Sequence, residues 1–110
     1  MIEERIQKIE STIQTSSNLP PETRAELMSL VAGLKAEVSR LSETHHEEAS
    51  SITHYADASV HEAARAEKDP ALAEGALEGL RSSIAGLEES HPTLVGAVNR
   101  FATALSIMGL

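Results

Sequence analysis

Apolar side chains recur at alternating steps of three and four residues along most of the chain, which is the spacing of one face of an α-helix. The first such stripe consists of Ile2, Ile6, Ile9 and Ile13, with polar and charged residues between them. No segment shows the strict alternation of apolar and polar residues that marks a half-buried strand. The pattern predicts an all-α protein.

Aromatic residues are almost missing, because Tyr55 and Phe101 are the only two in 110 residues. A core must therefore be built from aliphatic side chains and alanine. Such a core suits helix-on-helix packing, whereas strands favour aromatic and β-branched residues. A chain of this length corresponds to one domain, so we predict a single helical domain over residues 1–110.

Prolines mark the starts of three predicted helices, at Pro21, Pro70 and Pro92. Proline is tolerated in a first helical turn because its missing N–H would have no partner there. Asp69 precedes Pro70 and is a preferred N-cap residue. The predicted helices cover about residues 2–15, 21–67, 70–89 and 92–108.

The second of these helices is unusually long. Its heptad seam consists of Leu27, Val31, Leu34, Val38, Leu41, His45, Glu48, Ile52 and Tyr55, and it continues at Ser59. As one helix it would measure about 70 Å at 1.5 Å per residue, which exceeds the diameter of a compact domain this small. The pattern favours this continuous helix, packed against a second subunit. The alternative is a break near residues 42–44, because Thr44-x-x-Glu47 has the form of a capping box.

The predicted fold is therefore four helices, in an antiparallel bundle or in an extended coiled-coil-like arrangement around one long central helix. Small residues beyond Tyr55, namely Ala56, Ser59, Ala63 and Ala66, could pair with their own copy or form an alanine-rich surface without a partner. Gly75 and Gly79 share one face of the third helix. They could allow a close approach there, or they could be tolerated on a solvent-facing side.

Four of the five histidines lie between Thr44 and His61. On a helical wheel, His54, Asp57 and His61 fall on one outer face, where neighbours at i,i+3 and i,i+4 can place two ligands near one metal ion. Three ligands do not converge, because His54 and His61 are about 10 Å apart along the axis. A metal site would need a neighbouring subunit. The alternative is a solvated face with weak histidine–carboxylate pairs.

His45 and Glu48 fall instead on the inner seam and interrupt it with polar side chains. Together with Ile52, Tyr55 and Ser59, they are the residues that we predict to set the register of an interface. A buried His45 would also make assembly sensitive to pH. The alternative is that the helix leaves the core at this point and that both polar side chains reach water.

Charge and composition exclude several functions. The net charge of −8, from 17 acidic and 9 basic residues, repels phosphate backbones and argues against binding of nucleic acid. The absence of cysteine excludes disulfides, thiolate catalysis and cysteine-based zinc sites. The segment 92–110 carries only Arg100 as a charged residue, but Pro92 begins it and Asn99-Arg100 lies near its middle. We therefore expect a buried core helix there and no membrane span.

No catalytic constellation is visible. The cations Arg5, Lys8, Lys35 and Arg40 are scattered among more numerous acids, and no nucleophile–base pair, elbow or glycine-rich loop occurs. We expect neither enzymatic activity nor a cofactor. The charged start of the chain lacks the apolar core of a signal peptide. With the lack of cysteine, this favours a cytoplasmic location.

The stretch from Leu87 to Leu110, LEESHPTLVGAVNRFATALSIMGL, resembles the end of a family of small bacterial helical proteins known as domain of unknown function 4404. The resemblance is carried by Ser90-His91-Pro92 and by the ending Ala104-Leu105-Ser106-Ile107-Met108-Gly109-Leu110. The segment PPETRAEL at 20–27 is similar to the start of the family's second helix, whereas 42–68 departs from the family in length and histidine content. The resemblance implies a bacterial helical protein and no known activity.

These observations predict a non-catalytic α-helical oligomerisation or protein-interaction module, which forms a homodimer or a higher homo-oligomer. The alternative is a metal- or pH-responsive binding protein that uses the histidine-rich outer face.

Overall fold

The computed structural model describes residues 2–107 and contains five helices in that range. They are α1 (Ile2–Thr15), α2 (Pro21–Ser42), α3 (His46–Ala63), α4 (Pro70–Ser83) and α5 (Pro92–Ile107). No strand occurs in the described residues, which confirms the all-α prediction. The predicted helix end at Met108 and the last three residues of the family-like ending lie outside this range.

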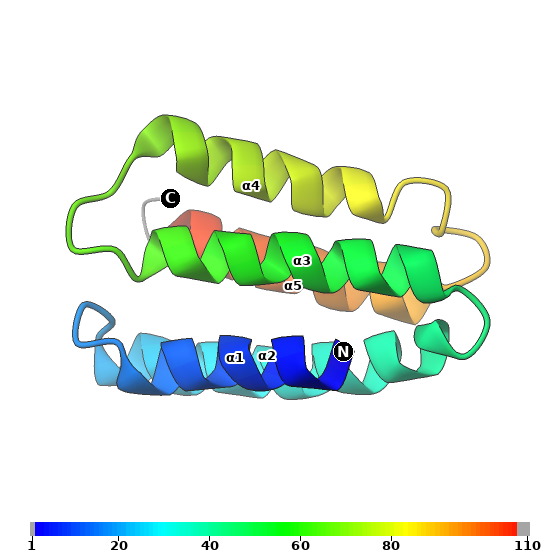
Figure 1. Ribbon diagram of the computed structural model, residues 1–110, viewed down its shortest axis with the longest axis horizontal. Helices are drawn as coiled ribbons and strands as arrows, with labels where there is room; N and C mark the ends of the chain where they lie inside the picture. Colours follow the sequence, from blue (N-terminus) through cyan, green and yellow to red (C-terminus); the bar gives the residue numbers. More distant parts are fainter. Residues whose placement is uncertain (1, 108–110) are drawn as a thin grey trace.

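Successive helices run in opposite directions and form layers (Figure 1). α1 and α2 lie together in one layer, α3 and α5 form the next, and α4 lies on the far side of these two. α3 contacts all four other helices, whereas α4 contacts α3 and α5 alone within the described residues. The molecule measures 37 × 24 × 22 Å.

The long central helix that we expected is not formed. α2 ends at Ser42 and α3 begins at His46, so the chain turns back through residues 43–45, where the alternative placed a break. The backbone N–H groups of Thr44 and His45 donate to the carbonyl of Leu41 at 3.1 and 2.8 Å and close the end of α2. The return allows α3 to pack on α1 and α2 of the same chain, so a second subunit is not needed to cover its apolar face.

The predicted capping box at this turn is also not formed. His45, not Thr44, is the N-cap residue of α3, and it makes no side-chain cap hydrogen bond. The hydroxyl of Thr44 instead lies 2.8 Å from Nδ1 of His45 and donates to the carbonyl of Leu41 at 3.4 Å. The side chain of Thr44 therefore serves the end of α2 and not the start of α3.

α4 begins as predicted but ends earlier than residue 89. The carboxylate of Asp69 accepts hydrogen bonds from the N–H groups of Ala71 and Leu72 at 3.1 and 3.3 Å. After Ser83 the chain enters a turn in which Gly86 has φ of +90°, a conformation that side-chain-bearing residues avoid. The apolar spacing continues past this end because Ile84 and Leu87 are buried from the turn itself.

The core is aliphatic, with Phe101 as its one fully buried aromatic side chain. All four isoleucines of the predicted α1 stripe are buried, and so are the predicted seam residues of α2 up to Leu41. The inward residues of α5 include Leu94, Val98 and Leu105, as expected for a core helix. Within residues 2–107, no helix combines the length and apolar character needed to cross a membrane.

The small residues of α3 are used inside the chain. Ala56, Ser59 and Ala63 are fully or almost fully buried among the surrounding helices, whereas Ala66 is exposed in the following loop. Three of the four residues are therefore covered by the chain's own helices, so in this fold they form neither a contact with their own copy nor a surface without a partner. α4 covers much of α3, since these two helices make the most extensive contact in the molecule.

The two glycines of α4 differ in their surroundings. A β-carbon on Gly79 would lie 3.0 Å or less from three atoms of the Tyr55 ring, so the ring occupies the space that the glycine leaves. A β-carbon on Gly75 would meet no atom within 4 Å. A close approach therefore occurs at Gly79, where the neighbour is a side chain, and Gly75 borders open space.

Candidate functional site

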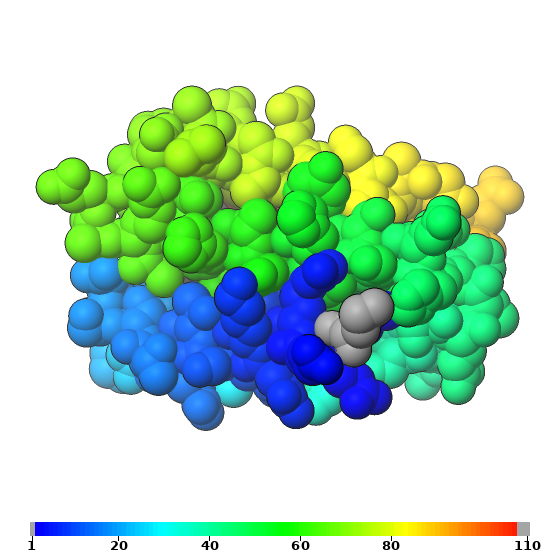
Figure 2. All heavy atoms as spheres, viewed as in Figure 1, coloured from blue at the N-terminus to red at the C-terminus, as the bar shows by residue number. Residues whose placement is uncertain are grey.

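Two surface features are candidates for function: a polar cleft between α1 and α3 and an apolar groove between α2 and α5. Figure 2 shows α1 (blue) lying against α3 (green) on one face of the molecule. His54 and Asp57 of the predicted outer stripe line the cleft between them, which has a volume of about 540 Å³. The other residues that line it are Glu4, Arg5 and Lys8.

The cleft is held by contacts between the two helices. Nη1 of Arg5 donates to the carbonyl oxygen of Ser50 at 3.1 Å, and Nζ of Lys8 lies 3.5 Å from Oδ2 of Asp57. The Lys8 side chain is largely exposed, so its ion pair contributes little to stability. Cations of α1 thus face the histidine stripe, a placement that spacing within the 42–68 segment could not reveal.

The predicted metal ligands do not form a centre within one chain. His54 and Asp57 border the cleft, but His61 does not line it. Asp57 is already paired with Lys8. Across the described part of the chain, no group of three or more His, Cys, Asp or Glu side chains is placed to hold a metal ion. A shared site with a second subunit stays a prediction.

The predicted register residues do not form one surface. His45 lies in the turn before α3, where its ring meets the ring of His91 edge-on, with centroids 5.3 Å apart. Glu48 is half-buried in the first turn of α3, and Tyr55 lies over Gly79. Ile52 and Ser59 are enclosed by the chain's own helices. These two cannot contact a second copy while the fold is intact.

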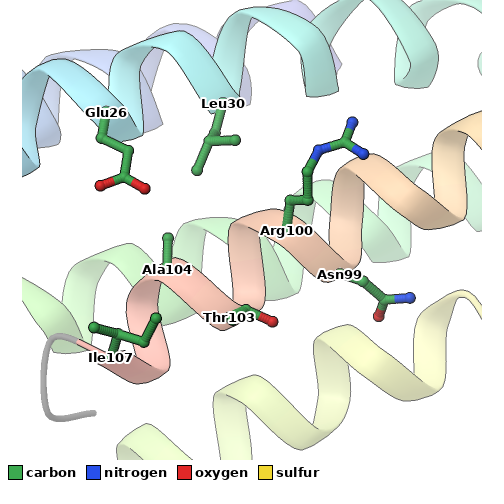
Figure 3. A pocket seen from close by; sticks show the side chains of 7 residues that line it. All are labelled: Glu26, Leu30, Asn99, Arg100, Thr103, Ala104 and Ile107. Carbon is green, nitrogen blue, oxygen red and sulfur yellow. The ribbon is translucent and has the colours of Figure 1, made fainter.

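The second candidate is the groove between α2 and α5, with a volume of about 320 Å³ (Figure 3). It is lined by Glu26 and Leu30 from α2 and by Asn99, Arg100, Thr103, Ala104 and Ile107 from α5. A smaller hollow adjoins it and shares Glu26, Ala104 and Ile107. We call this surface the α2–α5 groove.

Ile107 is the most exposed large apolar residue in the described range, with 81% of its surface accessible. The other such residue is Leu72 on α4, at 53%. Ile107 lies six residues after Phe101, which places it about 120° around α5 from that core residue. The core stripe of α5 could not identify Ile107, because Ile107 lies off that stripe. Leu30 and Ala104 are partly buried and extend the apolar surface into the groove.

The charged residues of the α2–α5 groove are Glu26 and Arg100. Figure 3 shows them toward opposite ends, with Leu30 and Thr103 between them. Both side chains are exposed, and neither forms an ion pair or a hydrogen bond within residues 2–107. The groove therefore has its acid and its base toward opposite ends, with Leu30 between them and Ile107 toward the end that contains Glu26.

Comparison of the chain with models of protein families, with curated proteins and with solved structures finds no match.

Proposed function

We propose that this protein is a non-catalytic helical module that assembles with a second copy of itself through the α2–α5 groove. The observation that carries the proposal is the exposure of Ile107 beside the apolar surface of Leu30 and Ala104. Burial of one isoleucine side chain on association contributes roughly 1.5–3 kcal/mol. In a symmetric dimer two copies of Ile107 would contribute.

The chemistry of the groove supports binding over catalysis. Contiguous apolar surface, rather than a single exposed side chain, marks an interaction site, and Ile107 shares such a surface with Leu30 and Ala104. A protein interface combines apolar with polar side chains, and the α2–α5 groove contains Leu30, Ala104 and Ile107 beside Glu26, Asn99 and Arg100. Its acid and its base lie apart and share no hydrogen bond. The lining contains no histidine or cysteine that Glu26 or Arg100 could activate.

Sedimentation velocity across a wide range of protein concentrations tests the proposal. We expect the unaltered protein to sediment as a dimer and the Ile107→Lys variant to sediment as a monomer. Because Ile107 is already exposed, the substitution leaves the fold intact, and an unchanged far-UV circular dichroism spectrum would verify this. Leu72→Lys is the matched control, since it places the same charge at the other exposed apolar residue.

The Leu72→Lys variant is expected to remain dimeric. A monomeric unaltered protein at every concentration would refute the proposed function. Equal loss of the dimer in both lysine variants would show that general charge, and not the α2–α5 groove, controls association.

A further inference from the structure

We propose that the two copies pair about a two-fold axis through the α2–α5 groove, so that Glu26 of each copy faces Arg100 of the other. This inference rests on the proposed function and specifies the partner's orientation. An isologous interface joins the same surface of both copies, and each residue pair across it occurs twice.

The two charged side chains of the groove lie at different positions along it. Glu26 lies toward the end of the groove that contains Ile107, and Arg100 lies toward the other end (Figure 3). Arg100 and Ile107 are seven positions apart in α5, which corresponds to roughly 10 Å along the helix. Rotation by 180° about an axis that crosses the groove at its middle, at right angles to its length, exchanges the two ends. Each acid of one copy is then placed at the end where the other copy has its base.

Both charged side chains of the groove are without a partner in the described part of the chain. Glu26 and Arg100 make no ion pair or hydrogen bond with any residue in the described range. Arg100 is also the only charged side chain of α5. Its guanidinium is therefore available to a carboxylate from outside, which it can bind through two parallel N–H donors.

Each chain carries a net charge of −8. Two copies of an acidic chain repel each other, so a stable contact between them requires local compensation. An arrangement with like ends together would place Glu26 of one copy against Glu26 of the other, and Arg100 against Arg100. Like charges in contact are strongly unfavourable at an interface. The two-fold arrangement with exchanged ends avoids both contacts and forms two opposite-charge pairs.

The other side chains of the groove fit the same arrangement. Leu30 and Thr103 lie between the two charges, so they meet their own copies near the axis. Ile107 of each copy is carried to the end of the groove with Asn99 and Arg100 of the other copy. The methylene stem of an arginine covers apolar surface while its guanidinium stays at the rim. Ile107 can therefore be covered without burial of an unpaired charge.

A charge exchange between two variants tests this pairing. In Glu26→Arg both pairs of the homodimer become cation against cation, and in Arg100→Glu both become anion against anion. We expect each variant alone to raise the dissociation constant of the dimer about tenfold or more. In an equal mixture, position 26 of one variant again faces a position 100 of opposite charge, at both pairs. The mixture should dimerise with the affinity of the unaltered protein.

Two controls carry the same charge changes elsewhere. Glu89→Arg alters the turn after α4, and Lys35→Glu alters the side of α2 opposite Glu26. Neither residue lines the α2–α5 groove, so both variants and their mixture should dimerise like the unaltered protein. Because salt screens surface charges, the dissociation constants of the Glu26→Arg and Arg100→Glu variants should approach that of the unaltered protein at about 1 M salt.

The outcomes separate this inference from the proposed function. A monomeric unaltered protein refutes assembly itself. If Ile107→Lys dissociates the dimer, assembly through the groove is supported. If that dimer tolerates both charge reversals, or if the mixture of the two variants does not restore it, the Glu26–Arg100 pairing is overturned while assembly through the groove stands. The two-fold pairing is supported if the Glu26→Arg and Arg100→Glu variants dimerise weakly by themselves but regain the affinity of the unaltered protein when mixed, while both control variants dimerise like the unaltered protein.

Discussion

Gly79→Ala and Gly75→Ala make the same chemical change one helical turn apart, and the structure predicts that only Gly75→Ala stabilises the protein. In the interior of a helix, alanine is about 1 kcal/mol more favourable than glycine. A β-carbon at position 75 meets no atom within 4 Å, so Gly75→Ala should realise this gain. A β-carbon at position 79 collides with the ring of Tyr55.

The expected magnitude at position 79 follows from two opposing terms. Overfilling a packed site typically costs about 1–3 kcal/mol, which offsets or exceeds the gain in helix propensity. We therefore expect Gly79→Ala to be about 1–3 kcal/mol less stable than Gly75→Ala, because the gain in helix propensity is common to both variants and only the overpacking cost differs. Urea unfolding followed by circular dichroism at one protein concentration measures both free energies of unfolding.

The Tyr55→Ala background identifies the cause of the difference. Without the ring, Gly79→Ala should stabilise the protein by about 1 kcal/mol, as Gly75→Ala does. The coupling between positions 55 and 79 in this double-mutant cycle should equal the overpacking cost, about 1–3 kcal/mol. Equal stabilisation by Gly75→Ala and Gly79→Ala in the unaltered background would refute the reasoning, because it would show that the ring does not occupy that space.

The remaining predictions concern a helix cap and metal binding. Asp69→Ala should lower the free energy of unfolding by about 1 kcal/mol, because the N–H groups of Ala71 and Leu72 lose their acceptor. Asp69→Asn, which can still cap, should cost less in the same urea titration, and equal losses would contradict the capping role. Calorimetric titration with Zn²⁺ should show no stoichiometric binding, since one chain gathers fewer than three ligands in its described part. Stoichiometric binding that is lost when His54→Ala and His61→Ala are combined would instead support the metal-responsive alternative.

Helix boundaries set by local chemistry could be predicted from the sequence. The bounds of α1 and the starts at Pro21, Pro70 and Pro92 follow from apolar spacing and from the tolerance of proline in a first turn. The end of α4 could not be predicted in this way. Ile84 and Leu87 continue the helical spacing and are buried, but they reach the core from a turn.

The turn between α2 and α3 shows where local reasoning reaches its limit. Residues 42–46 contain no glycine or proline, and the heptad spacing continues through them. The turn therefore arises from tertiary packing, because the return of the chain buries Ala49, Ile52 and Val60 against helices of the same molecule. A pattern of apolar residues shows which faces must be covered and does not show whether the cover comes from the same chain.

The candidate sites depend on contacts between segments that are distant in sequence. The exposure of His54 and His61 agrees with the predicted outer face. The contacts of Arg5 and Lys8 with that face required the packing of α1 on α3. The α2–α5 groove had no signal in the sequence, because it joins Glu26 and Leu30 to residues of the last helix.

The position of α3 has a consequence for how the protein unfolds. α3 contacts every other helix, and in the described residues neither α1 nor α2 touches α4. The outer layers are thus connected mainly through one helix whose buried face is rich in alanine and contains Ser59. Unfolding of α3 would expose the buried faces of both outer layers at once. Partial opening around α3 therefore gains little conformational entropy and exposes much apolar surface. We therefore expect the five helices to unfold as one cooperative unit, in which loss of native structure in α3 is accompanied by loss of the whole fold.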